Sequence, residues 1–147
     1  DGWTVTASPD GTLTDKDKNS YGYLFYEALV NRKAFSTEEG FIIPANKRAE
    51  AFSEILASYG FNEQETADFI EYWADYLKDG TDYVMHPMMT EGVDNAMPLT
   101  FSVKLDSIYR IWFGFAEYSG DEITPPEITP IVRKGFTVVE WGGAVLD

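Results

Sequence analysis

Apolar residues recur at helical spacing in the middle of the chain and alternate with polar residues on either side of it. Between residues 46 and 79 the spacing is i, i+3, i+4 and i+7, which is typical of amphipathic helices. The buried stripes are predicted to hold Phe52, Ile55, Leu56 and Tyr59 in a first helix, and Phe69, Ile70, Trp73, Tyr76 and Leu77 in a second. Gly60 ends the first helix, and Asn62 caps the second with Glu65 as its partner. The short connection predicts an antiparallel helical hairpin.

Strand-like patterns flank this hairpin. Residues 3–7 alternate at period two and lead through the turn at residues 8–11 toward Leu13, which predicts a β-hairpin. Further strands are predicted at residues 21–29, 41–43, 83–85, 99–105, 108–118 and 136–141. The run 108–118 is apolar on both faces, so we expect it at the centre of the sheet. The prolines of residues 121–130 predict an extended loop.

The order of these segments predicts an α+β fold. We expect an antiparallel or mixed β-sheet packed against the helical hairpin at about residues 46–79, with a single domain over residues 1–147. A chain of 147 residues that is 44% hydrophobic can bury one core of this kind.

Charge and residue types exclude several functional classes. The chain carries 25 acidic and 11 basic residues, a net charge of −14, which opposes binding to nucleic acid and to anionic membranes. It contains no cysteine, which excludes disulfides, thiolate zinc sites and cysteine nucleophiles. Its apolar runs are too short for a membrane span, so we expect no membrane insertion.

Metal and nucleophile motifs are incomplete. The spacing of Asp15, Asp17 and Asn19 resembles the start of a calcium loop, but Ser20 replaces the required glycine and Tyr26 the closing glutamate. His86 is the only histidine and is expected in a loop at a strand end; no Gly-x-Ser-x-Gly motif accompanies it. We expect no metal site and no cofactor.

Three charged residues lie in apolar segments predicted to be strands: Glu27, Arg110 and Glu140. Because an isolated buried charge is costly, we expect the arginine to bridge the two carboxylates. Such a cluster can fix strand register. Alternatively, Glu27 and Glu140 are the two carboxylates of a glycoside hydrolase, although an adjacent arginine would keep both pKa values low.

Aromatic residues are abundant, at 16% of the chain. Trp73 and Trp112 are expected in the core. The candidates for an exposed surface that stacks on sugar rings are Trp3, Tyr21, Tyr23 and Trp141.

The C-terminal string Gly-Phe-Thr-Val-Val-Glu-Trp-Gly-Gly at residues 135–143 also carries a resemblance. Together with residues 2–7, 9–11 and 23–27, it resembles a family of uncharacterised bacterial proteins, many with export signals. The family commonly reads Tyr-Leu-Tyr-Trp-Glu where this chain has Tyr-Leu-Phe-Tyr-Glu at residues 23–27. The resemblance implies an extracytoplasmic location and an upstream strand that completes the sheet, but no activity.

These observations favour a noncatalytic domain of an exported bacterial protein. We expect an interaction or binding module at the cell envelope, with a protein or an envelope polysaccharide as its partner. A glycoside hydrolase that uses Glu27 and Glu140 and a carbohydrate-binding module are the alternatives. A hydrolase requires a cleft where both acids converge, whereas a binding module requires an exposed aromatic or apolar patch.

Overall fold

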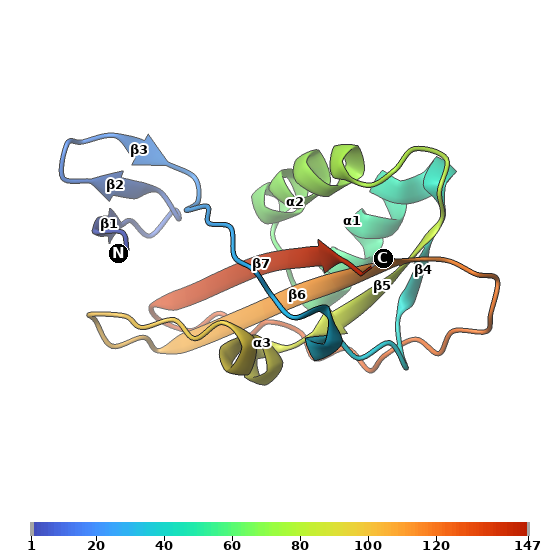
Figure 1. Cartoon of the computed structure of the whole chain (residues 1–147). Helices are drawn as coiled ribbons and strands as arrows, with labels where there is room; N and C mark the ends of the chain where they lie inside the picture. The colour runs from blue at the N-terminus through green and yellow to red at the C-terminus, as the bar shows by residue number, and fades with distance from the viewer. Residues whose placement is uncertain (1, 147) are drawn as a thin grey trace.

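The structure, a computed structural model, describes residues 2–146 and combines strands with helices in a single α+β domain (Figure 1). The main sheet has four strands in the order β4-β5-β6-β7. Their bounds are Phe41–Ile43 for β4, Tyr83–Met88 for β5, Ser107–Glu117 for β6 and Thr137–Val145 for β7. The pairs β4-β5 and β5-β6 are antiparallel and β6-β7 is parallel, so of the two predicted forms, antiparallel or mixed, the sheet is mixed. The predicted central strand is also confirmed, because β6 lies between β5 and β7.

The predicted helical hairpin consists of α1 (Arg48–Tyr59) and α2 (Glu63–Tyr76). A short 3-10 helix, η2 (Ala45–Lys47), leads into α1 after β4. Gly60 ends α1 in the left-handed conformation at φ 84°, which glycine adopts without strain. The side chain of Asn62 accepts from the Glu65 N–H while the Glu65 carboxylate accepts from the Asn62 N–H, so the predicted capping box is present.

Both faces of the main sheet are covered, which explains why β6 is apolar on both sides (Figure 1). Ile111, Phe113 and Phe115 of β6 pack under α1 and α2 in the larger core. Trp112 faces the opposite side, where it packs in a smaller cluster with Val93 of a third helix, α3 (Thr90–Ala96). This third helix was not predicted, since seven residues are too few to establish a helical period.

A small antiparallel sheet at the N-terminus projects away from the main sheet (Figure 1). Its strands are β1 (Val5–Ala7), β2 (Leu13–Asp15) and β3 (Ser20–Tyr21). The predicted hairpin up to Leu13 is confirmed by the β1-β2 pairing. The Asp15 carboxylate accepts the N–H groups of Asp17 and Asn19 at 2.9 Å. The Asp-x-Asp-x-Asn pattern therefore closes the β2-β3 turn.

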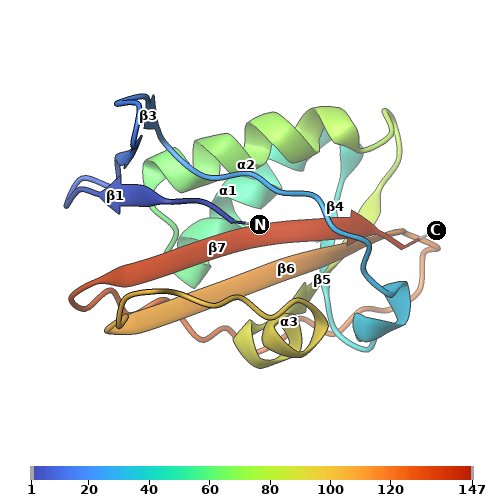
Figure 2. The ribbon, with the colours of Figure 1, turned by 60° about the vertical axis from the view of Figure 1, so that its left-hand side comes forward.

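Two predicted strands are wrong. Of residues 21–29, only Tyr21 belongs to a strand; residues 22–30, which we call the strap, run extended over the sheet to the 3-10 helix η1 (Arg32–Ala34) (Figure 2). Residues 99–105 alternate in polarity but also form no strand. In both cases the local pattern suits a strand, yet no described neighbouring strand pairs with it. Strand formation requires such a neighbour as well as local propensity.

The final strand continues through Gly142 and Gly143 rather than ending at them. A Cβ on Gly142 would lie 2.8 Å from the Trp112 indole, and a Cβ on Gly143 would lie 2.8 Å from the Trp73 ring on the other face. The two glycines therefore allow a tryptophan to pack closely against each face of β7.

We expect Gly142→Ala to lower the free energy of unfolding by about 1–3 kcal/mol, because the new methyl group displaces the Trp112 ring. Gly22→Ala is the control, since nothing lies within 4 Å of the position that its methyl group would take. Urea unfolding followed by tryptophan fluorescence measures both. Equal stability of the two variants would show that close packing on Gly142 is unimportant.

Candidate functional site

Arg110 and Glu140 form an ion pair on the face of the sheet opposite α1 and α2. The parallel pairing of β6 and β7 sets the two residues directly opposite each other. The Arg110 side chain is fully buried, the Glu140 side chain is 12% exposed, and Arg110 Nε lies 2.7 Å from Glu140 Oε2. This contact was predicted from the position of both charges in apolar segments of the sequence.

The guanidinium of Arg110 has an acceptor for each of its donors. Besides Oε2, these are Glu140 Oε1 at 3.1 Å, Asp94 Oδ1 at 2.7 Å, the Met97 carbonyl at 2.7 Å and the Tyr26 hydroxyl at 3.5 Å. Burial alone would lower the pKa of Arg110, but its hydrogen bonds to Glu140 and Asp94 outweigh this effect and raise it. Arg110 is therefore a permanent cation inside the fold.

The Glu140 carboxylate likewise accepts several hydrogen bonds. Its Oε1 accepts from the Tyr26 hydroxyl and from Trp112 Nε1, each at 2.8 Å, in addition to Arg110. Burial, together with the hydrogen bond to Glu140 and its negative charge, raises the pKa of Tyr26 to about 12, so the hydroxyl remains a donor near neutral pH. A general acid or base needs a lone pair or proton that substrate can reach. Both carboxylate oxygens of Glu140 already accept hydrogen bonds from side chains of the fold.

Glu27 does not join this cluster. It is exposed on the strap, and its charge contributes to raising the pKa of Tyr72 on α2, after burial and Tyr76. No hydrogen bond or ion pair links Glu27 to Arg110 or Glu140 within residues 2–146. The prediction that Arg110 bridges Glu27 and Glu140 is therefore wrong for Glu27. Arg110 instead donates hydrogen bonds to Tyr26, the residue before Glu27 on the strap, and to Asp94 of α3. Because the strap is not a strand, alternation could not predict which of the two side chains turns inward.

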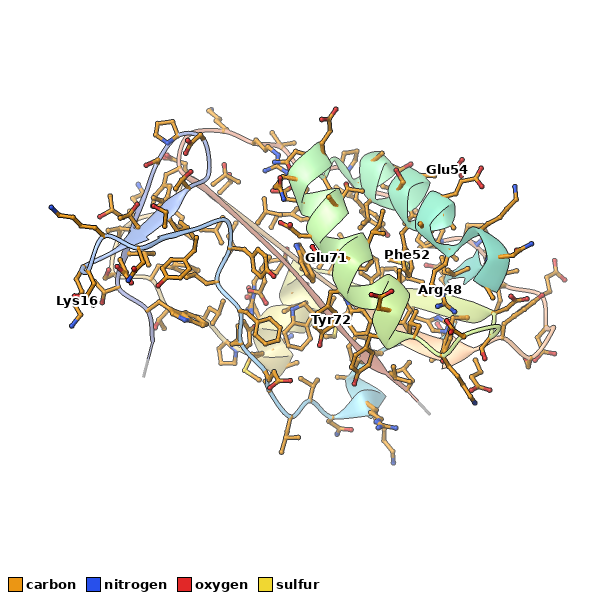
Figure 3. The ribbon with its side chains drawn as sticks, turned by 90° about the horizontal axis from the view of Figure 1, so that it is seen from above. Lys16, Arg48, Phe52, Glu54, Glu71 and Tyr72 are labelled. Carbon is orange, nitrogen blue, oxygen red and sulfur yellow. The ribbon has the colours of Figure 1, made fainter. Side chains whose placement is uncertain are left out.

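Exposed aromatic rings gather where the strap passes α2 (Figure 3). We call Tyr23, Phe25, Tyr72 and Tyr76 the aromatic surface; their exposed fractions are 52%, 53%, 36% and 61%. The Phe25 and Tyr72 rings lie 6.0 Å apart, and the Tyr72 and Tyr76 rings lie 5.6 Å apart at an interplanar angle of 12°. The surface therefore joins two segments that are distant in the sequence.

The predicted ligand-binding residues lie in different parts of the structure and do not form one surface. Tyr23 belongs to the aromatic surface, and Trp3 is exposed beside the Tyr26 ring at 5.9 Å. Tyr21 lies on the small sheet, where its hydroxyl donates to Asp15. Trp141 is only partly exposed, because its ring packs on Phe69 at 5.4 Å as well as on Tyr23 at 6.2 Å.

Phe25, Tyr72 and Tyr76 were missed as exposed candidates. Tyr76 was expected on the buried stripe of the second helix, whereas the buried residues of α2 are Phe69 and Trp73. The i, i+4 spacing of Tyr72 and Tyr76 was the available signal, because it places both rings on one helix face.

His86 is buried within β5 rather than placed in a loop, which corrects the expected position. Its Nδ1 lies 2.7 Å from the Glu39 carbonyl, so the ring donates a hydrogen bond there. The Ser107 hydroxyl, on the neighbouring strand β6, bonds with Thr137, at 2.6 Å between hydroxyl oxygens. No group of three or more potential metal ligands converges in residues 2–146.

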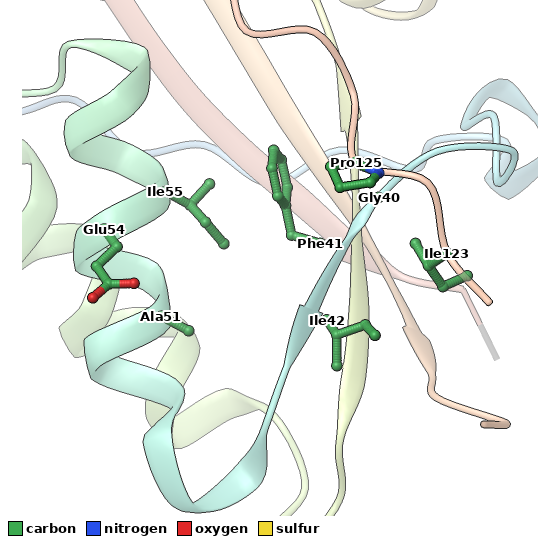
Figure 4. A pocket seen from close by; sticks show the side chains of 8 residues that line it. All are labelled: Gly40, Phe41, Ile42, Ala51, Glu54, Ile55, Ile123 and Pro125. Carbon is green, nitrogen blue, oxygen red and sulfur yellow. The ribbon is translucent and has the colours of Figure 1, made fainter. Parts of the chain in front are cut away.

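A shallow hollow lies between β4, α1 and the proline-containing loop (Figure 4). Its lining consists of Gly40, Phe41, Ile42, Ala51, Glu54, Ile55, Ile123 and Pro125. Glu54 is the single titratable side chain among them, so the hollow lacks the convergent polar groups of an enzyme site.

Comparisons of the chain with protein-family models, curated proteins and solved structures find no match. None of the described helices has the length and apolar character needed to cross a membrane.

We expect Glu140→Gln to destabilise the fold by about 3 kcal/mol, because it leaves the buried Arg110 charge poorly compensated. Glu27→Gln removes the same charge from an exposed site and should change stability by less than about 0.5 kcal/mol. Thermal and urea unfolding measure both variants, which match in net charge. A similar loss in the two would contradict the different roles assigned to these acids.

Proposed function

We propose that this chain is a noncatalytic binding module of an exported bacterial protein and acts at the cell envelope through the aromatic surface. The observation that carries the proposal is the contiguous set of exposed rings from the strap and α2. The exported location rests on the resemblance of the C-terminal string.

The exposure of these rings supports a contact function. Large aromatic side chains normally bury most of their surface, and an exposed group of them marks an interaction site more often than single exposed residues do. The strap positions Phe25 against Tyr72 through side-chain packing. Its neighbour Tyr26 is hydrogen-bonded to the buried ion pair, which orients this part of the strap.

The acidic residues near the aromatic surface limit the kind of partner that it can bind. Glu27 lies close enough to Tyr72 to help raise the pKa of that tyrosine. Glu71 of α2 lies at the surface beside Tyr72 (Figure 3), and Asp75 of the same helix is exposed as well. With a net charge of −14 for the whole chain, the surface favours a neutral or basic partner over an anionic one.

The hydrolase alternative has less support. The two candidate acids lie in different surroundings, Glu27 exposed and Glu140 hydrogen-bonded to Arg110, Tyr26 and Trp112. Glycoside hydrolysis by a carboxylate pair requires both groups to reach one glycosidic bond.

Carbohydrate binding is the second candidate. The exposed tyrosine rings of the aromatic surface favour it, because each offers an apolar face and a polar hydroxyl edge to a sugar ring. A polysaccharide and an extended peptide would both use the aromatic surface, so one set of variants tests both.

We expect the double variant Phe25→Ser, Tyr72→Ser to weaken binding at least about tenfold, since each lost ring contact is worth ~1 kcal/mol or more. The probes are purified bacterial peptidoglycan, in co-sedimentation, and the peptide acetyl-Lys-Val-Thr-Ile-Lys-Val-Thr-Ile-Lys-amide, in a fluorescence titration. The control is Phe101→Ser, Val103→Ser, which removes exposed apolar side chains from another loop. Unchanged binding in the double variant, or binding of neither probe to the unmodified chain, would overturn the proposal.

A further inference from the structure

Among residues 2–146, the outer edge of β7 carries backbone groups without hydrogen-bond partners. Leu146, just beyond β7, donates its N–H to the Phe115 carbonyl of β6 at 2.8 Å, so even-numbered residues of this segment face β6. Because the direction of the backbone groups alternates along a strand, the N–H and C=O groups that point away from β6 are those of Val139, Trp141, Gly143 and Val145. No hydrogen bond within residues 2–146 reaches these groups, and β6 is the one strand there that pairs with β7.

The strap passes this edge without pairing to it. Figure 2 shows it running past α2 and across β7 to η1. Within residues 2–146, no backbone group of residues 22–30 takes part in a hydrogen bond. Side chains hold the strap instead, through the Tyr26 hydroxyl on Glu140 and the Tyr23 ring on Trp141. A shift of the strap away from β7 would therefore break the Tyr26–Glu140 hydrogen bond and the Tyr23–Trp141 ring contact, but no backbone hydrogen bond.

We propose that β7 binds an extended polypeptide segment of a partner as an additional strand of the main sheet. The inference rests on the proposed function and names the class of partner. A paired strand supplies a carbonyl for each outward N–H and an N–H for each outward C=O. Long unpaired edges are otherwise avoided in soluble proteins because they recruit other strands.

The surroundings of β7 define the chemistry of the peptide. On the helix side of the sheet the new strand would pass Trp141, Tyr23 and Phe25, so alternate residues should be apolar. The exposed carboxylate of Glu27 and the net charge of −14 favour lysine or arginine at the remaining positions. The same charge opposes pairing of β7 with a second copy of this chain.

Amide hydrogen exchange measured by NMR tests the geometry. In the free protein the amides of Val139, Trp141, Gly143 and Val145 should exchange faster than those of Val138, Glu140, Gly142 and Ala144, which face β6. The peptide acetyl-Lys-Val-Thr-Ile-Lys-Val-Thr-Ile-Lys-amide should then slow the four outward amides at least about tenfold. Two control peptides should bind at least about tenfold more weakly. One carries N-methyl groups on alternate residues, and the other has glutamate in place of lysine.

A variant of β7 provides an independent test of strand addition. Val139→Pro removes one outward N–H while leaving the inward bonds of β7 to β6, and should weaken peptide binding. Val103→Pro, in an exposed loop, is the control. Should Val139→Pro fail to fold, the N-methylated peptide still tests the same hydrogen bonds from the partner side.

The outcomes separate this inference from the proposed function. Peptide binding that is lost in Phe25→Ser, Tyr72→Ser but leaves the four amides unprotected would overturn strand addition and retain the aromatic surface. A dimer by sedimentation, with these amides already slow in the free protein, would assign the edge to a second copy and overturn the partner peptide. Absence of protection at about 1 mM peptide would also overturn the inference.

Discussion

The buried ion pair between Arg110 and Glu140 is the constraint around which this fold is organised. A fully buried guanidinium is tolerated only when its charge and donors are compensated, and here the compensation comes from several separate segments. β7 supplies Glu140 in register with Arg110, α3 supplies Asp94, and the strap supplies Tyr26. The charge of Arg110 therefore connects the main sheet, α3 and the strap.

The ion pair connects segments at the centre of the main sheet but leaves the outer edge of β7 without a paired strand among residues 2–146. The strap is hydrogen-bonded at Tyr26 but has no backbone hydrogen bonds to residues 2–146, and its Tyr23 and Phe25 rings are exposed. β7 is fixed on one side by β6 and, among the described residues, is unpaired on the other. Both features follow from fixing the strap through a side chain rather than through a β-ladder. They leave an aromatic surface and an unpaired strand edge at the same side of the domain.

Local signals in the sequence predicted the elements whose stability is local. The helical hairpin, its cap at Asn62 and the hairpin leading to Leu13 all follow from spacing and turn residues. The path of the strap was not predicted, because its aromatic run has strand propensity but pairs with no strand among residues 2–146. The same error misplaced Glu27, which was expected inside the charge cluster because residues 21–29 were predicted to be an apolar strand. The Arg110–Glu140 contact was predictable because the cost of isolated burial does not depend on which strands are neighbours.

A double-mutant cycle on the ion pair is the decisive measurement. Urea unfolding is measured for Arg110→Met, Glu140→Leu and the double variant. If the pair organises the fold, the double variant loses less stability than the sum of the two single losses, with a coupling free energy of about 2 kcal/mol or more. Each single change leaves one buried charge without its partner, whereas the double change removes both charges. Additive losses would contradict the organising role of the pair, because they would show that the two residues stabilise the fold independently.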